Sequence, residues 1–371
     1  MFLGACNLVQ NTQENSQIAH YLVSKSDLSL DSVYADKIYN VLLGELYNQF
    51  GDVELSAKHY QSLVIDTDNS AIARRATILA ATSGLNNDAL KAARSWISIS
   101  PDSLEARQYL SLLLLRNKDF DNAVEQIQKI RLYIEEDENE GNKNNEKVSY
   151  SKGLKFIGSM LNIESYHEDS FIVFQKYIEK YGHEKEKTQQ YLILSSLAMN
   201  AKKYDVVLSA FKSIEDEDLK RTSKITLMKV KALQESNKIS EAVQILQQFV
   251  DKQHPSDSTK LQLVRLLILN DQKKTASPYL KELVNKYPDN NDLLKSLIAL
   301  EIDQSQLQSA RNNIKKLSKS KDYDSDVAYF SGEISEAEGD IQSALKSYQK
   351  VIKGSLKKRA KKKIIKLKML N

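Results

Sequence analysis

Small side chains recur along this chain at a nearly constant spacing, and large apolar side chains follow them at helical intervals. After Ala123, Ile127 and Ile130 stand four and seven positions later, and Leu280 and Leu283 follow Ala276 in the same way. These intervals place the three side chains on one face of a helix. Two helices cross closely only where one presents a small side chain, so the pattern predicts antiparallel helix pairs. The marking positions are Ser56, Ala89, Ala123, Ser170, Val207, Ala242, Ala276, Ala310 and Ala344.

Successive positions in this series lie 33, 34, 47, 37, 35, 34, 34 and 34 residues apart. Gly51-Asp52 and Gly339-Asp340 stand where a turn should join the two helices of a pair. Pro101-Asp102 and Pro288-Asp289 stand between pairs, where a helix has to stop. Val207 departs from the series because it is not small, but it keeps the phase.

This layout resembles the tetratricopeptide repeat (TPR), a helix–turn–helix unit of 34 residues. The resemblance implies an all-α fold: a right-handed α-solenoid of about nine repeats, with repeats 1–3 over 37–133, repeats 4–9 over 149–354 and a capping helix over 355–371. It also implies a non-catalytic scaffold that binds a protein or peptide in a concave groove lined by the first helices. More narrowly, the chain resembles uncharacterised proteobacterial envelope TPR lipoproteins in Leu42-Leu43-Gly44-Glu45-Leu46, Ala73-Arg74-Arg75-Ala76, Leu90-Lys91-Ala92-Ala93-Arg94-Ser95-Trp96 and Pro101-Asp102-Ser103-Leu104-Glu105-Ala106.

Counting from the small-residue series, we expect seven polar side chains on the first helices to face the groove. These are Arg74, Gln108, Lys155, Asn162, Lys231, Arg265 and Lys295. Cations and amides could hold the carboxylate or backbone of an acidic peptide through charge-assisted hydrogen bonds, although an ordinary solvated helix face has the same composition. The carboxylate clamp of chaperone-binding repeats is not reproduced, since Val41 and Glu45 stand where its first Lys and Asn would be.

The single step of 47 residues indicates an insertion, which coincides with an acidic, Asn-rich stretch. We expect residues 134–148 to form a disordered loop, because the stretch is strongly charged and poor in apolar residues. Glycine and proline are scarce elsewhere, with 11 and 4 in 371 residues, or about 4%, which favours nearly continuous helix.

The net charge of +4 conceals a basic end. Nine Lys and Arg residues and no acidic residue lie between Ile352 and Asn371, which leaves 44 basic against 49 acidic residues in the rest of the chain. Leu356, Ala360, Ile364 and Leu367 share one helical face of this segment. We expect it to cap the last repeat, and the alternative is an amphipathic helix on anionic lipid or nucleic acid.

The chain has one cysteine, Cys6, which excludes an intrachain disulfide and any Cys-based metal site. Leu3-Gly4-Ala5-Cys6 resembles a bacterial lipobox without the basic and apolar regions of a full signal. We therefore expect residues 1–6 to be the remnant of a longer signal, 7–36 to be a spacer and leading helix, and Cys6 to carry a lipid anchor. This places the protein in the bacterial envelope, on the periplasmic side of the outer membrane. The alternative is a cytoplasmic TPR regulator that senses a peptide or nucleic acid.

Catalytic chemistry is not expected. The five histidines are scattered, and the chain contains no HExxH pair, nucleophile elbow, P-loop or dinucleotide-binding glycine pattern. The sequence therefore predicts no catalytic residue, metal site or cofactor, and it makes nucleic acid an unlikely partner.

Overall fold

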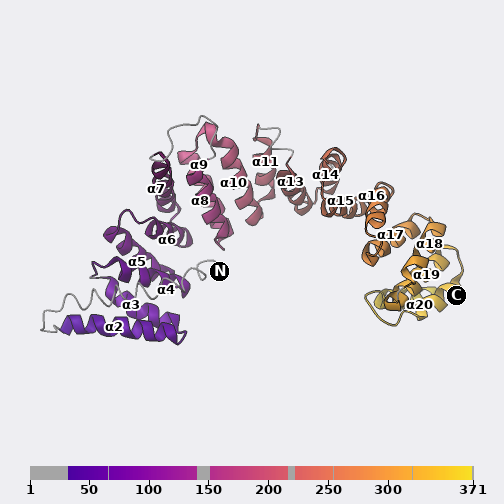
Figure 1. The fold of residues 1–371 in the computed structure, drawn as a ribbon, viewed down its shortest axis with the longest axis horizontal. Helices are drawn as coiled ribbons and strands as arrows, with labels where there is room; N and C mark the ends of the chain where they lie inside the picture. The colour runs from indigo at the N-terminus through magenta and orange to yellow at the C-terminus, as the bar shows by residue number, and fades with distance from the viewer. Residues whose placement is uncertain are drawn as a thin grey trace. The chain divides into compact units, whose positions relative to one another are not determined.

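A computed structural model describes residues 32–65, 67–139, 151–215, 222–253, 255–319 and 321–369. Cys6 and the leader around it lie outside these ranges. Within them the chain is helical (Figure 1). Its helices divide between two compact units, residues 1–216 and 217–371. In the described residues, consecutive helices form nine antiparallel hairpins followed by one further helix.

The first unit holds five of these hairpins. They are α2 (Ser32–Gln49) with α3 (Val53–Val64), α4 (Ser70–Thr82) with α5 (Asn86–Ile99), α6 (Leu104–Arg116) with α7 (Phe120–Asn139), α8 (Lys152–Ile163) with α9 (His167–Tyr181), and α10 (Lys187–Asn200) with α11 (Tyr204–Lys212). Each second helix from α3 to α9 also packs on the first helix of the next hairpin, so the hairpins stack in chain order.

The second unit holds four hairpins and the final helix. They are α13 (Ser223–Glu235) with α14 (Ile239–Gln253), α15 (Asp257–Leu269) with α16 (Lys273–Lys286), α17 (Asn291–Asp303) with α18 (Leu307–Leu317), α19 (Asp324–Ala337) with α20 (Ile341–Gln349), and α21 (Lys357–Met369). The predicted fold class, an α-solenoid of nine TPR-type hairpins with a capping helix, is confirmed.

All nine small-residue positions are completely buried in the helix crossings, from Ser56 to Ala344, including the larger Val207. The large residues four and seven positions later are buried as well; Ile127, Phe174, Phe211 and Leu280 have no exposed surface. The series therefore identifies the helix faces that meet, because a small side chain lets the backbones approach and its large neighbours fill the remaining space.

The turn inside each hairpin has a recurrent geometry. In eight of the nine hairpins that the described ranges contain, the second residue after the first helix adopts a left-handed φ between 57° and 82°. The next N–H then donates back to that helix, as Asp52 does to the Tyr47 carbonyl at 2.9 Å. This bond satisfies a carbonyl that the helix end would leave free. The left-handed positions are Gly51, Gly84, Lys118, Lys202, Asn237, Asp271, Ser305 and Gly339.

Helix α21 covers the open side of the last hairpin. Ala360 and Leu367 are 1% and 2% exposed, and the Lys363 ammonium lies 2.9 Å from a Glu336 carboxylate oxygen on α19. A terminal hairpin otherwise leaves its apolar face in water, so this packing is what a capping helix requires.

Two expected boundaries differ from the structure. Helix α2 begins at Ser32, before the expected start of the first repeat at residue 37. Helix α7 continues to Asn139, so the first residues of the expected disordered insertion 134–148 are helical. A side-chain hydrogen bond stabilises this last part of α7: the Arg131 guanidinium donates to Glu135, one turn later, at 2.9 Å. Residues 140–150 lie outside the described residues.

Candidate functional site

The first helices α6 and α8 enclose a pocket of about 370 Å³ in the first unit. Its wall is mainly apolar: Tyr109 and Leu112 come from α6, and Phe156, Met160 and Ile163 come from α8. Four of these side chains are half-buried, while Ile163 is 67% exposed at the mouth. A concave apolar surface with a few polar groups is the usual form of a site that holds a side chain of a ligand.

One end of this pocket is closed by an ion pair. The Arg116 guanidinium donates to Glu164 Oε2 at 2.8 Å, with the two side chains 17% and 3% exposed. The guanidinium also lies 5.6 Å from the centre of the Tyr166 ring, and the N–H of Ser165 donates to Glu164 Oε1 at 2.9 Å. The charges at this end are therefore satisfied within the fold, which leaves the apolar wall as the main binding surface.

Burial raises the pKa of Tyr109 to about 12, with a further contribution from the charge of Glu105. Its hydroxyl therefore stays protonated at neutral pH and can donate or accept a hydrogen bond. Tyr109 gives the pocket a neutral polar group beside its apolar wall.

Two of the seven expected groove residues are engaged in ion pairs inside the fold. Arg74 forms a two-bond pair with Glu105 at 2.9 and 2.8 Å, and it lies 5.9 Å from the centre of the Trp96 ring. Lys295 lies 2.8 Å from Asp292 and 3.8 Å from Asp326. These two cations join neighbouring helices.

The other five lie on first helices, in different settings. Gln108 lines the α6–α8 pocket. Asn162 accepts from Ser196 at 2.8 Å and Asn200 at 3.1 Å, so it joins α8 to α10. Lys155, Lys231 and Arg265 are exposed, and none of them pairs with a carboxylate among the residues that the structure describes. Lys155 is one helical turn before Ser159, which also lines the pocket.

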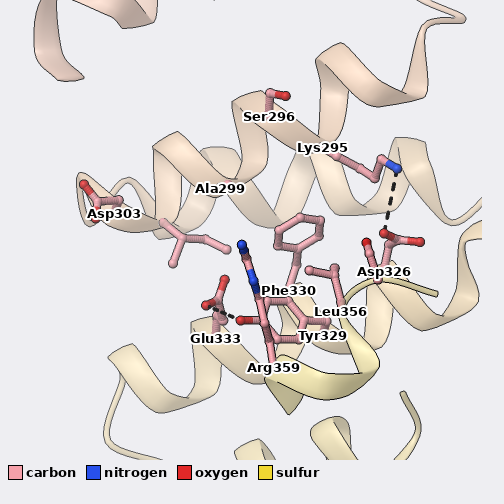
Figure 2. Close-up of a pocket in the computed structure, with 12 residues that line it drawn as sticks. Lys295, Ser296, Ala299, Asp303, Asp326, Tyr329, Phe330, Glu333, Leu356 and Arg359 are labelled. Atoms are coloured by element: carbon pink, nitrogen blue, oxygen red, sulfur yellow. Dashed lines mark hydrogen bonds and ion pairs between the residues drawn. The ribbon is translucent and has the colours of Figure 1, made fainter. Parts of the chain in front are cut away.

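A second pocket, of about 430 Å³, lies in the second unit between α17, α19 and the start of α21. Figure 2 shows Phe330 and Tyr329 at its centre, with Arg359 of α21 reaching in beside Glu333. The Tyr329 hydroxyl donates to Glu333 at 3.0 Å. This wall mixes cations with carboxylates, so it is less suited than the α6–α8 pocket to an apolar side chain.

The apolar wall of the α6–α8 pocket is not among the groove positions that the repeat spacing predicts, although α8 carries a signal for it. Leu154, Ile157 and Leu161 form the buried face of this helix, and Phe156 and Met160 add a second apolar stripe beside it. An apolar arc wider than one buried face indicates a further contact surface.

Within the described ranges, no group of three or more His, Cys, Asp or Glu side chains is placed to hold a metal ion. In the same ranges, no helix has the length and apolar character needed to cross a membrane.

Several solved TPR structures are similar to this chain. YrrB, described as a TPR protein with an unusual peptide-binding site, is 17% identical, with 48% of this chain and 90% of YrrB covered and a TM-score of 0.38. MamA MSR-1 C2 is 14% identical, with 44% and 94% covered and a TM-score of 0.36. The TPR domain of P58(IPK) is 11% identical, with 90% and 98% covered and a TM-score of 0.30. No family model and no curated protein matches the sequence.

Proposed function

We propose that this protein is a non-catalytic scaffold that binds a peptide segment of another protein on the first helices of its N-terminal unit. The apolar wall between α6 and α8 carries the proposal. It offers Leu112, Phe156 and Met160 to a ligand side chain while the ion pair beside it is already satisfied. Burial of one large side chain in such a pocket contributes about 1.5–3 kcal/mol.

The ligand should combine an apolar anchor with a nearby carboxylate. Lys155 is exposed one helical turn from the pocket residue Ser159, so its ammonium can reach an acidic group outside the pocket. A charge-assisted hydrogen bond from Lys155 would then fix the direction of the peptide on α8.

A library of random 12-residue peptides displayed on phage tests this proposal with the full chain as the target. Selected peptides should share a large apolar residue followed or preceded by Asp or Glu. Met160→Glu should weaken them at least tenfold, because it places a charge in the apolar wall. The matched control is Leu269→Glu on α15, which is 66% exposed and lies in the other unit. Peptides that bind Met160→Glu as well as the wild type would refute the site.

We also propose that the scaffold works in the bacterial envelope, anchored through an acylated Cys6. The support is the order Leu3-Gly4-Ala5-Cys6, with the only cysteine of the chain at the acceptor position. Expressed from its native locus, the protein should partition with membranes, and Cys6→Ser should reduce that fraction. A wash with 500 mM NaCl removes protein that is held only by charge. A Cys6→Ser protein that stays with the membranes after this wash as fully as the wild type does would rule out the anchor.

A further inference from the structure

Helix α21 has a second face that its capping role does not use. Ala360 and Leu367 are buried against the last hairpin. Because each helical residue turns by about 100°, Lys358, Lys362, Ile365 and Met369 lie together on the opposite side. We call these four residues the outward face of α21. Ile365 is 60% exposed and Met369 is 82% exposed, so two apolar side chains stand in water one turn apart.

The outward face lies in a region of concentrated positive charge. Residues 357–369 contain eight Lys and Arg residues and no Asp or Glu. Seven of the eight are exposed, and within the described part of the chain only Lys363 forms an ion pair, with Glu336 at 2.9 Å. Arg359 lies beside Glu333 in the second pocket. The remaining six cations of α21 have no ion-pair partner among the described residues, and they repel one another unless an external anion offsets them.

We propose that the outward face of α21 docks on an anionic phospholipid bilayer. Clustered lysines on a helix are attracted by the negative potential of such a surface, and each adds roughly a fivefold gain in binding. Ile365 and Met369 are placed to enter the boundary between headgroups and acyl chains, while Lys358 and Lys362 beside them meet the lipid phosphates.

The composition of α21 favours a lipid surface over nucleic acid. Single-stranded nucleic acid is held largely by aromatic side chains that stack on bases, and arginine predominates in specific base contacts. Residues 357–369 contain no aromatic residue and one arginine, Arg359, which reaches into the pocket shown in Figure 2. Exposed apolar side chains among lysines can instead insert between the headgroups of a bilayer while the lysines stay at its surface.

Vesicle sedimentation with the full-length Cys6→Ser protein tests the proposal without any contribution from an acyl chain. Binding should be strong to vesicles of phosphatidylcholine and phosphatidylglycerol in a 7:3 ratio, weak to pure phosphatidylcholine, and lost as NaCl is raised from 50 to 500 mM. Lys366 is exposed one turn after Lys362 and borders the outward face. The triple variant Lys358→Gln/Lys362→Gln/Lys366→Gln should bind the anionic vesicles about 100-fold more weakly. Ile365→Ser/Met369→Ser should weaken binding about tenfold.

The matched control removes the same charge elsewhere in the unit. Lys315, Lys316 and Lys319 are exposed at the end of α18, and their triple Gln variant should change binding less than fivefold. All these variants keep Ala360 and Leu367, so their circular dichroism and melting should match the wild type. Equal affinity for neutral and anionic vesicles, or an α21 triple variant no weaker than the α18 control, would overturn the proposal. It would also be overturned if a 20-base-pair DNA duplex bound more tightly than the anionic vesicles at equal salt and displaced them.

Discussion

Gly44 lies against the ring of Tyr60, and a Cβ atom at residue 44 would come within 2.7 Å of two atoms of that ring. Gly332 and Tyr348 have the same relationship in the last hairpin, with the same distance of 2.7 Å. Tyr60 and Tyr348 are 0% and 1% exposed, so neither ring can move into water to make room. The hairpins at the two ends of the array therefore use the same close packing of a glycine on α2 or α19 against a tyrosine on the second helix.

Gly44→Ala should destabilise the protein by about 1–3 kcal/mol, although alanine is the better helix former by about 1 kcal/mol. The reason is that the added methyl group overlaps a buried ring. Urea unfolding followed by circular dichroism measures the change. Tyr60→Leu removes the ring, so Gly44→Ala should cost much less in a Tyr60→Leu background. Equal costs in the two backgrounds would show that the ring is not the cause.

Replacement of Arg75 should lower the free energy of unfolding, because it leaves the half-buried carboxylate of Glu45 in the first unit without its cation. Arg75 donates twice to Glu45, at 2.9 Å each, and the side chains are 10% and 20% exposed. The Tyr60 hydroxyl also donates to Glu45 at 2.7 Å. Arg75→Met should cost about 3 kcal/mol. The double variant Arg75→Met/Glu45→Leu should recover most of that loss in the same unfolding experiment, and a loss that stays the same would refute the unpaired charge as its source.

Leu367→Ala should weaken the cap on the second unit. Leu367 is 2% exposed, and loss of a buried leucine side chain costs about 2–5 kcal/mol. Ile365→Ala on the same helix is the control, because Ile365 is 60% exposed and its loss should change stability by less than about 0.5 kcal/mol. Hydrogen exchange in α19 and α20 reports the effect locally. Similar exchange in both variants would contradict the assigned orientation of α21.

Glu333 should make the protein less stable as the pH rises. Burial is the largest influence and raises the pKa of its carboxyl, against the hydrogen bond that Tyr329 donates. The folded state therefore holds this proton more tightly than the unfolded chain does. The resulting stabilisation is complete below about pH 4.5 and is lost as the pH rises through the folded pKa. Glu333→Gln should melt at a higher temperature than the wild type at pH 7, and the difference should vanish near pH 4.

Glu336, one turn later on α19, should show the opposite dependence. Burial acts to raise its pKa, but hydrogen bonds from Tyr348 and Lys363 outweigh burial and lower it. The ionised Glu336 carboxylate stabilises the folded protein above the ordinary glutamate pKa. This stabilisation is lost as the pH falls through the pKa that Glu336 has in the folded state. Glu336→Gln should therefore melt below the wild type at pH 7, with a smaller difference at acid pH. At pH 7, a Glu336→Gln variant that melts above the wild type, or a Glu333→Gln variant that melts below it, would contradict the assignment of that residue.

The repeat positions could be read from the sequence because the information is local. Whether a helix can approach its neighbour depends on the size of one side chain, and Ala123 or Ala276 reveals this without knowledge of the partner. Turns were harder to identify. Gly51 and Gly339 indicate a left-handed residue, whereas Lys202 and Ser305 adopt the same conformation with side chains that give no such signal.

The groove could be predicted only in outline, because the state of a charged side chain depends on residues from other repeats. Arg74 was expected to face a ligand, but its partner Glu105 comes from the next hairpin, 31 residues later. Lys295 meets Asp326 in the same way. Likewise, the α6–α8 pocket joins residues on both sides of the insertion, and spacing along the chain does not indicate that they meet.

Trp96 is the only tryptophan of the chain, and it is 3% exposed beneath the guanidinium of Arg74 in the first unit. Its emission, excited at wavelengths that spare tyrosine, therefore reports on the N-terminal half of the molecule alone. Ellipticity in the far ultraviolet records the loss of helices in both halves. Comparing the two signals during one titration with urea would reveal whether the array comes apart in a single step or one half at a time.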